Sequence, residues 1–309
     1  MRSPLKMAGS FLTNAEIRFG YLNKMGFYHH LSDEQYIMKK SRIYLHYVPD
    51  LQNPHTYNEK LNWLKLHDHN PLYTQLVDKY EVKKYIEAHI GTQYIVPTLG
   101  IWDRFDEIDF DSLPQQFVLK CTHDSGGVVI CTDKAHFDRQ AAEKKLTAAL
   151  GFNYYYDSRE WPYKDVKPRI MAEKYLVDSA DGELRDYKFY TFNGVVRAML
   201  IVGDRSKADM PTTYDYFDRE DQWLDFRFGG PNAQQHPHPP KHLQEMIALA
   251  EQLSKEIVHV RVDFYEVDGQ IYFGEMTFYD GGGSQPFEPF AWDRQFGDWI
   301  SLPEKKQEK

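Results

Sequence analysis

The sequence is short of cysteine and of positive charge, and each shortage excludes a class of protein. Only two of the 309 residues are cysteines, Cys121 and Cys131; they form no Cys-x-x-Cys pair and have no histidine at ligand spacing beside them. A zinc site and a disulfide framework are therefore disfavoured, and we expect two buried thiols. The 46 acidic residues outnumber the 37 basic ones, and the net charge of −9 argues against a general nucleic-acid binder.

Long apolar runs are missing as well. No stretch approaches the roughly 20 apolar residues that span a bilayer, and the first twelve residues lack the apolar stretch of a secretory signal. We therefore predict a cytoplasmic protein without a transmembrane segment. A Walker A loop and a Gly-x-Gly-x-x-Gly fingerprint are also absent from the sequence, which disfavours the P-loop and dinucleotide-binding folds.

The apolar pattern predicts helices first and strands afterwards. Up to about residue 90 it indicates helices, including one from Leu72 to His89, and short strands are expected at 94–96 and 99–102. From Gln116 on, strands with glycine turns dominate, and Asn193-Gly194 predicts a tight hairpin. This order predicts an α+β fold with mostly antiparallel strands, and a chain of this length should form two or three lobes.

A lysine precedes a glycine turn between two apolar strands. The first strand carries Lys120 near its end, and the turn runs from His123 to Gly127. Adjacent glycines let backbone N–H groups approach phosphate oxygens closely, and the lysine adds a mobile positive charge. An ordinary hairpin turn explains the same pattern.

Three other segments carry lysines among chemically useful neighbours. They are Asp78 to Lys83, on a predicted helix with Lys79 and Lys83 on one face; the strand Glu173 to Leu176; and Asp186-Tyr187-Lys188. Taken singly, each is explained by a solvated charged face, an ordinary strand or a snorkelling lysine.

The C-terminal hairpin gathers acidic residues. Alternation places Arg261 and Asp263 on one face of its first strand, and Glu275 and Thr277 on one face of its second. A two-residue Asp268-Gly269 turn would send Glu275 to the opposite side. A three-residue turn with a bulge at Gly269 would instead pair Arg261 with Glu275 and gather all four, and we expect this register. Two carboxylates and a hydroxyl then suit Mg²⁺, with a cross-strand Arg261–Glu275 ion pair as the alternative.

Taken in order, these segments resemble the ATP-grasp superfamily. The shared pattern is Asp-Lys-x-x-x-Lys, a strand–lysine–glycine loop–strand unit, a Glu-x-x-Leu hinge, and Arg-x-Asp followed by Glu-x-(Asn or Thr). A closer resemblance is to the TupA-like ATP-grasp proteins of bacterial surface-polysaccharide synthesis, some of which are labelled glycosyltransferases. It rests on residues 53–61, 76–80, 113–120 and 261–265 and covers roughly residues 20 to 290.

The resemblance implies two α+β lobes that hold ATP between antiparallel sheets. A helical region at 1–92 would come first, then a central region at 93–176 with the lid loop 123–127 and the hinge 173–176, then a lobe at 177–309 with the metal site. ATP and Mg²⁺ are the implied cofactors. For the nucleotide the implied residues are Lys79 or Lys83, Lys120, Ser125, Gly126, Gly127, Glu173, Lys174, Tyr175 and Leu176; for the metal Asp263, Glu275 and Thr277; for catalysis Arg261 and Lys188; for the substrate Gly281, Gly282, Gly283 and Ser284.

Two positions depart from the superfamily pattern. Thr277 stands where asparagine is frequent, and Cys121 follows Lys120 where proline is common. The implied reaction is nevertheless an ATP-dependent ligation, in which an acyl phosphate formed from a sugar carboxylate or glycan is captured by an amino acid or amine. Alternatives are a glycosyltransferase, because Asp109-Phe110-Asp111 formally matches an Asp-x-Asp motif, a kinase, and a non-catalytic nucleotide-binding partner.

Overall fold

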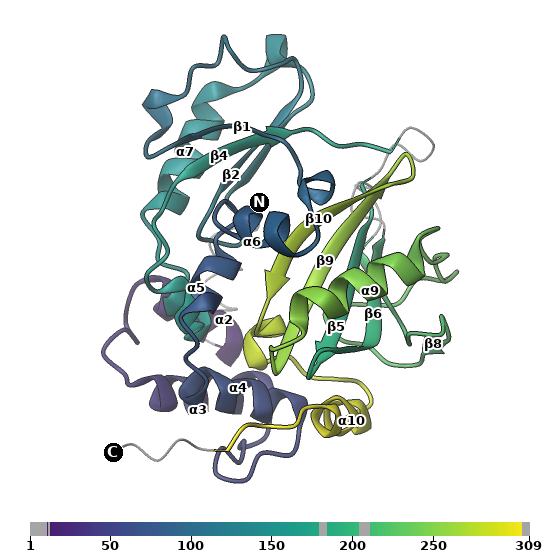
Figure 1. Cartoon of the computed structure of the whole chain (residues 1–309). Helices are drawn as coiled ribbons and strands as arrows, with labels where there is room; N and C mark the ends of the chain where they lie inside the picture. Colours follow the sequence, from purple (N-terminus) through teal and green to yellow (C-terminus); the bar gives the residue numbers. More distant parts are fainter. Residues whose placement is uncertain (1–10, 12, 179–183, 204–210, 305–309) are drawn as a thin grey trace.

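A set of helices precedes two antiparallel sheets in the computed structural model, which describes residues 11, 13–178, 184–203 and 211–304 (Figure 1). The helices are α2 (Ala15–Lys24), α3 (Asp33–Tyr44), α4 (Tyr57–His67), α5 (Leu72–Val77) and α6 (Val82–His89). Capping boxes begin two of them, where Ser32 and Thr56 exchange hydrogen bonds with Gln35 and Glu59. The predicted α+β class with antiparallel strands is confirmed.

The single helix predicted from Leu72 to His89 is wrong. Asp78 is extended, and its side chain accepts hydrogen bonds from the N–H groups of Tyr80 and Glu81, which turns the chain between α5 and α6. The expected strand at 94–96 is also wrong, since Thr92–Tyr94 forms a 3₁₀ turn, η1.

The first sheet has the strand order β1-β4-β2-β3 and stands at the top of Figure 1. Its strands are β1 (Thr98–Trp102), β2 (Phe117–Cys121), β3 (Val128–Cys131) and β4 (Ile170–Lys174), and helix α7 (Arg139–Leu150) packs on it. Phe117, Leu119 and Leu146 belong to the core formed there, which also buries Cys121 and Cys131 as free thiols.

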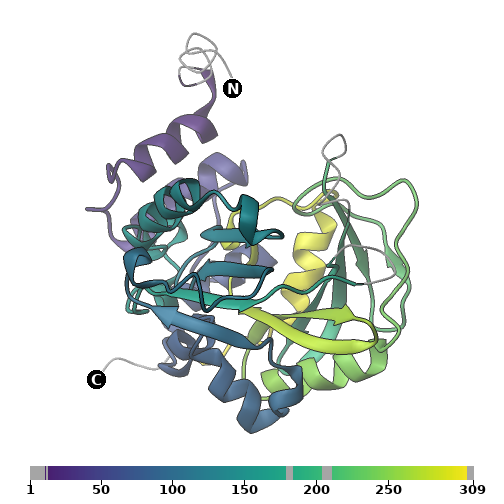
Figure 2. The same cartoon turned by 90° about the horizontal axis from the view of Figure 1, so that it is seen from above.

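The second sheet has the order β10-β9-β5-β6-β7-β8. Its strands are β5 (Asp186–Phe192), β6 (Val195–Gly203), β7 (Thr213–Phe217), β8 (Trp223–Leu224), β9 (His259–Val267) and β10 (Gln270–Thr277). The predicted hairpin at Asn193-Gly194 joins β5 to β6, with both residues at positive φ. Helix α9 (Leu243–Ser254) covers this sheet, on the side of the molecule away from α2 and α3 (Figure 2).

Short elements complete the described ranges. They are α8 (Tyr155–Ser158), α10 (Ala291–Trp299) and the 3₁₀ turns η2 (Phe105–Glu107), η3 (Lys134–His136), η4 (Trp161–Tyr163) and η5 (Asp280–Gly283). Helix α10 packs on α4 and ties the C-terminal end to the N-terminal helices. Among the described residues, no helix is long and apolar enough to cross a membrane.

The register of β9 with β10 differs from the expected one. The turn is the two-residue Asp268-Gly269, with both residues at positive φ, so the predicted bulge at Gly269 is wrong. A bulge at Gly274 instead shifts the register, so that Glu275 pairs with Asp263 and Thr277 with Arg261. Gly274 suits this place because a Cβ there would lie 3.1 Å from the Asp263 carbonyl oxygen. The four residues thus share one face because of the bulge at Gly274 and not because of the turn.

Candidate functional site

A cavity of about 680 Å³ lies between the two sheets. Strands β2, β3 and β4 contribute to its wall from the first sheet, and β5, β9 and β10 from the second. It brings together the residues implied for the nucleotide except Gly127, together with one residue implied for catalysis and two implied for the metal. The first group is Lys79, Lys83, Lys120, Ser125, Gly126, Glu173, Lys174, Tyr175 and Leu176, and the others are Lys188, Asp263 and Glu275. Residues far apart in the sequence therefore converge on one cleft.

Glu173 joins two lysines inside this cleft. Its carboxylate oxygens each lie 2.6 Å from one ammonium nitrogen, that of Lys83 and that of Lys120. Burial opposes the charge on Glu173, but the two lysines outweigh it and hold its pKa below the usual range. Burial lowers the pKa of Lys83 in spite of its carboxylate partner. The cleft thus holds two ammonium groups whose shared counterion is a single side chain.

Lys79 lies apart from Lys83 and supports the glycine loop. Its backbone N–H donates to Thr122 O (3.0 Å), and its ammonium donates to the carbonyl oxygen of Asp124. Gly126 has a φ of +103°, and a Cβ there would meet no atom within 4 Å, so the loop presents open space at this point. At Gly127 a Cβ would lie 2.5 Å from Oδ2 of Asp124, so a larger residue there would displace this carboxylate.

The segment after Glu173 forms one edge of the cleft. Lys174 donates its N–H to Pro97 O (3.0 Å), so any contact of its backbone with a base has to be made by the carbonyl oxygen. Leu176 is buried against Val96 and Val267 and gives this edge an apolar floor. A flat apolar ring with polar edges fits such a slot.

Arg261 is the centre of a second cluster. Its guanidinium donates two hydrogen bonds to Asp263 (2.8 and 2.9 Å), one to Glu275 (3.2 Å) and one to the Thr277 hydroxyl (3.1 Å), and it also binds the carboxylate of Asp280. Lys188 binds the same Asp263 carboxylate. Burial opposes the charge on Asp263, but Arg261 and Lys188 hold its pKa below the usual range.

This cluster borders a smaller polar cavity of about 270 Å³. Arg261, Thr277, Gly281 and Gly282 line it, while Ser125 and Glu275 line both this inner cavity and the cleft. The two spaces therefore meet at the glycine loop and Glu275. Of the predicted substrate residues, Gly283 is buried with its carbonyl oxygen bound to Asn62, and Ser284 faces a third cavity.

Several residues of the inner cavity were not foreseen from the sequence. They are Lys40, Asp124, Tyr154, Asp157, Ser158, Glu160, Tyr279 and Asp280. Glu160 is buried, and this burial raises the pKa of its carboxyl group even though Lys65 counteracts it. Among these residues, Asp280 could have been suspected from the sequence, because it immediately precedes the predicted substrate residues Gly281 to Ser284. The others come from α3, the glycine loop, α8 and neighbouring loops, and share no sequence pattern.

The Arg261 cluster supplies only some of the oxygen ligands that a hard divalent cation needs. No group of three or more histidine, cysteine, aspartate or glutamate side chains is arranged around a possible metal position in the described ranges. Glu275 and Asp263 nevertheless pair across the strands, and the Glu275 side chain is 42% exposed. Two carboxylates supply the oxygen ligands that Mg²⁺ prefers, provided that phosphates and water complete its shell.

Asp109 and Asp111 lie elsewhere. Both are exposed, and the Asp109 carboxylate accepts a hydrogen bond from the N–H of Asp111 (3.0 Å) within a surface turn. Neither lines the cleft or the inner cavity. The tripeptide is explained by turn formation.

Residues 59–301 match the family described as TupA-like ATPgrasp. Similar solved structures include a D-alanine–D-alanine ligase from Bacillus anthracis (18% identity, 66% of this chain and 57% of that chain, TM-score 0.39). Another is the D-cycloserine synthetase DcsG (15% identity, 74% of this chain and 70% of that chain, TM-score 0.42). A third is a D-alanine–D-alanine ligase from Helicobacter pylori (14% identity, 75% of this chain and 60% of that chain, TM-score 0.42). The match to the Bacillus anthracis ligase spans 57% of that ligase's length. No curated protein sequence matches it.

Proposed function

The chain belongs to the TupA-like ATP-grasp family, as its sequence motifs predicted, and we propose that it is an ATP-dependent carboxylate–amine ligase. The proposed substrates are a sugar carboxylate and an amino acid or other amine, joined as an amide during synthesis of a bacterial surface polysaccharide. The observation that carries the proposal is the junction at Glu275, where a cleft with paired lysines meets a polar cavity centred on Arg261.

The nucleotide is assigned to the cleft between the sheets. Lys83 and Lys120 would exchange their shared partner Glu173 for phosphate oxygens, with Ser125, Gly126 and Gly127 closing over them. The segment Lys174 to Leu176 would hold the adenine. We accordingly assign the lid to the region 93–176 and the metal-bearing lobe to 177–309.

In the proposed reaction, an oxygen of the substrate carboxylate attacks the γ-phosphorus and ADP leaves. The amine then attacks the acyl carbon, phosphate leaves with the former carboxylate oxygen, and the amine loses its proton. Arg261 lies where it would neutralise negative charge on the acyl phosphate and on the tetrahedral oxyanion. Lys188, held by Asp263 and Asp186, adds positive charge on the phosphate side.

Mg²⁺ would be held by Asp263 and Glu275, with Thr277 as a weaker oxygen ligand. When bound, it neutralises charge on the phosphates during phosphoryl transfer. Glu275 is the more accessible carboxylate, since the Asp263 side chain is only 2% exposed.

The test is product analysis with Mg-ATP, a uronic-acid glycan and a pool of amino acids. Release of ADP and phosphate only when both carboxylate and amine are present supports the ligase. ADP release with the glycan alone and a stable phosphorylated product would indicate a kinase. Sugar transfer from a nucleotide sugar without ATP would indicate a glycosyltransferase, and nucleotide binding without turnover a non-catalytic partner.

A further inference from the structure

An outer cavity of about 320 Å³ continues from the inner one. The two share Lys40, Asp157 and Gly281 in their walls, so they meet at these residues. The outer cavity runs between helix α2, which contributes Phe19, Gly20 and Asn23, and the segment 284–286. A substrate that places its reactive group beside Arg261 therefore has room to extend toward the N-terminal helices.

Lys40 stands at the border between the two cavities with little compensation for its charge. Its ammonium donates to Asp157 O (3.0 Å), and it makes no ion pair with any carboxylate in the described ranges. Burial lowers its pKa, an effect that Asp157 and Glu160 oppose from a distance. An ammonium group has three donors. A desolvated cation with donors to spare is stabilised by an anionic ligand.

Asn23 lines the same cavity and carries a hydrogen-bond acceptor, whereas Lys40 carries donors. Its side chain is 3% exposed and donates to Tyr156 O (2.9 Å), while Oδ1 is buried and has no hydrogen-bond partner among the described residues. A buried acceptor without a partner costs free energy that a hydroxyl donor recovers. Phe19 and Tyr44 supply aromatic walls to the same cavity. Oδ1 is shielded from the cavity space, so a hydroxyl reaches it only when the Asn23 side chain rotates. The outer cavity thus combines a cation and aromatic faces with an acceptor that a ligand can recruit.

We propose that the outer cavity binds a second, acidic sugar unit of the carboxylate substrate, with Lys40 holding its anionic group and Asn23 accepting from a hydroxyl. This inference rests on the proposed function, since it assigns the reacting carboxylate to the inner cavity. Both residues precede residue 59, where the family match begins. The helices α2 and α3 therefore determine a preference for acidic oligomers over single sugar acids.

The test compares binding of galacturonate and digalacturonate by isothermal titration calorimetry, with the full chain and Mg-ADP present. Wild type should bind digalacturonate at least about tenfold more tightly, the gain expected from a hydrogen bond to a charged group. Lys40→Met should abolish this preference, and Lys40→Arg should keep part of it. Equal binding of the two probes by wild type would overturn the inference.

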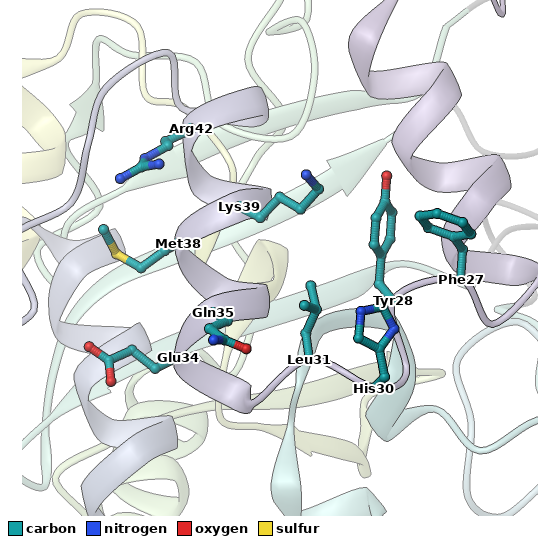
Figure 3. A pocket seen from close by; sticks show the side chains of 9 residues that line it. All are labelled: Phe27, Tyr28, His30, Leu31, Glu34, Gln35, Met38, Lys39 and Arg42. Carbon is teal, nitrogen blue, oxygen red and sulfur yellow. The ribbon is translucent and has the colours of Figure 1, made fainter.

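Lys39→Met is the matched control. Lys39 lies next to Lys40 on helix α3 but lines a separate surface pocket beside Tyr28 and Phe27 (Figure 3). Its ammonium lies 5.3 Å from the Tyr28 ring centre. This variant should keep the wild-type preference; an equal loss in both variants would contradict a specific role of Lys40.

A steric variant covers the case in which Lys40→Met does not fold. A Cβ on Gly20 would lie 3.8 Å from the Tyr44 hydroxyl, and both residues line the outer cavity. Gly20→Leu should therefore weaken digalacturonate and spare galacturonate; unchanged binding of both would count against the subsite. Mg-ADP affinity, measured separately by fluorescence, distinguishes failure of the proposed ligase function from failure of the proposed subsite. A wild type that does not bind Mg-ADP refutes the ligase itself, whereas normal Mg-ADP binding without any preference between the acids refutes only this inference.

Discussion

At the scale of single residues, the carboxylates around Arg261 differ in how far they can be changed. Asp263 is buried, and its charge is matched by both Arg261 and Lys188. Glu275 meets the same guanidinium from a half-exposed position between the two cavities. Asp263 therefore also neutralises two buried cations, whereas Glu275 is the more accessible of the two proposed metal ligands.

We predict different outcomes for the two matched amides. Glu275→Gln should lower Mg-dependent ATP turnover by at least about a hundredfold, as expected for loss of a charge that stabilises phosphoryl transfer, with little change in unfolding midpoint. Asp263→Asn should also lose turnover, and should lower the free energy of unfolding by about 3 kcal/mol because two buried cations, Arg261 and Lys188, lose the carboxylate that they share. Coupled-enzyme assays and urea titration check both. Wild-type turnover in either variant would refute the metal assignment.

Glu173 links stability to pH. Its folded pKa lies below the unfolded value of about 4.5, so its contribution is fully present above that value and is lost as the pH falls through the folded pKa. Glu173→Gln should be destabilised by about 3 kcal/mol at pH 7, because Lys83 and Lys120 lose their shared partner. Its difference from wild type should shrink as the pH falls below 4.5.

Urea titrations at several pH values measure this difference. The exposed Glu87 on α6 provides the control, and Glu87→Gln should follow the wild-type profile throughout. A Glu173→Gln deficit that stayed constant down to the lowest pH at which the fold persists would speak against the lysine pairing.

At the scale of elements, the hairpin β9–β10 positions the cluster through one extra residue. The tight Asp268-Gly269 turn by itself would place Glu275 on the face opposite Asp263. The bulge at Gly274 reverses this, and it packs so closely that a Cβ would lie 3.3 Å from the Tyr265 ring. The strand register of this hairpin therefore sets the position of Glu275 relative to Asp263.

We predict that Gly274→Val disturbs the bulge and lowers ATP turnover by at least about tenfold. The added carbons meet the Asp263 carbonyl and the Tyr265 ring, and overpacking of this kind costs about 1–3 kcal/mol. Gly151→Ala, at the end of α7, serves as the control, since a Cβ there makes only ordinary contacts. Equal turnover in the two variants would show that the bulge does not set the position of Glu275.

At the scale of the whole molecule, the cleft joins two sheets with separate cores. One core belongs to the first sheet and α7, and the other to the second sheet with α4, α9 and α10. Glu173 on β4, Lys83 on α6 and Lys120 on β2 meet in the cleft. A ligand that contacts both walls stabilises their arrangement through its binding free energy.

Mg-ADP should accordingly stabilise the folded chain. At a hundred times its dissociation constant the gain is about 2.7 kcal/mol, and a thermal-shift titration measures it. Lys120→Met should require a much higher concentration for the same shift. Lys144→Met, an exposed position on α7, should behave as wild type. Absence of any shift in wild type would contradict nucleotide binding in the cleft.

The sequence by itself determined the features that depend on neighbouring residues. Ser32 and Thr56 begin helices because their side chains satisfy N–H groups three residues ahead, and Asn193-Gly194 turns a hairpin because both residues tolerate positive φ. The order of lysine, glycine loop, hinge and carboxylates was enough to predict the family. These signals are local, or preserved as an order along the chain.

Only the tertiary structure decided which distant groups share a cavity. The Gly274 bulge depends on how β10 packs against β9, so the turn sequence at Asp268-Gly269 does not specify it. Lys40 and Asn23 lie on helices whose ordinary surface pattern gives no hint of a ligand, and they line a cavity with Gly281 and Gln285 only after the chain has folded back. The physical reason is that packing joins residues more than 200 positions apart, and pairings of that range leave no periodicity in the sequence.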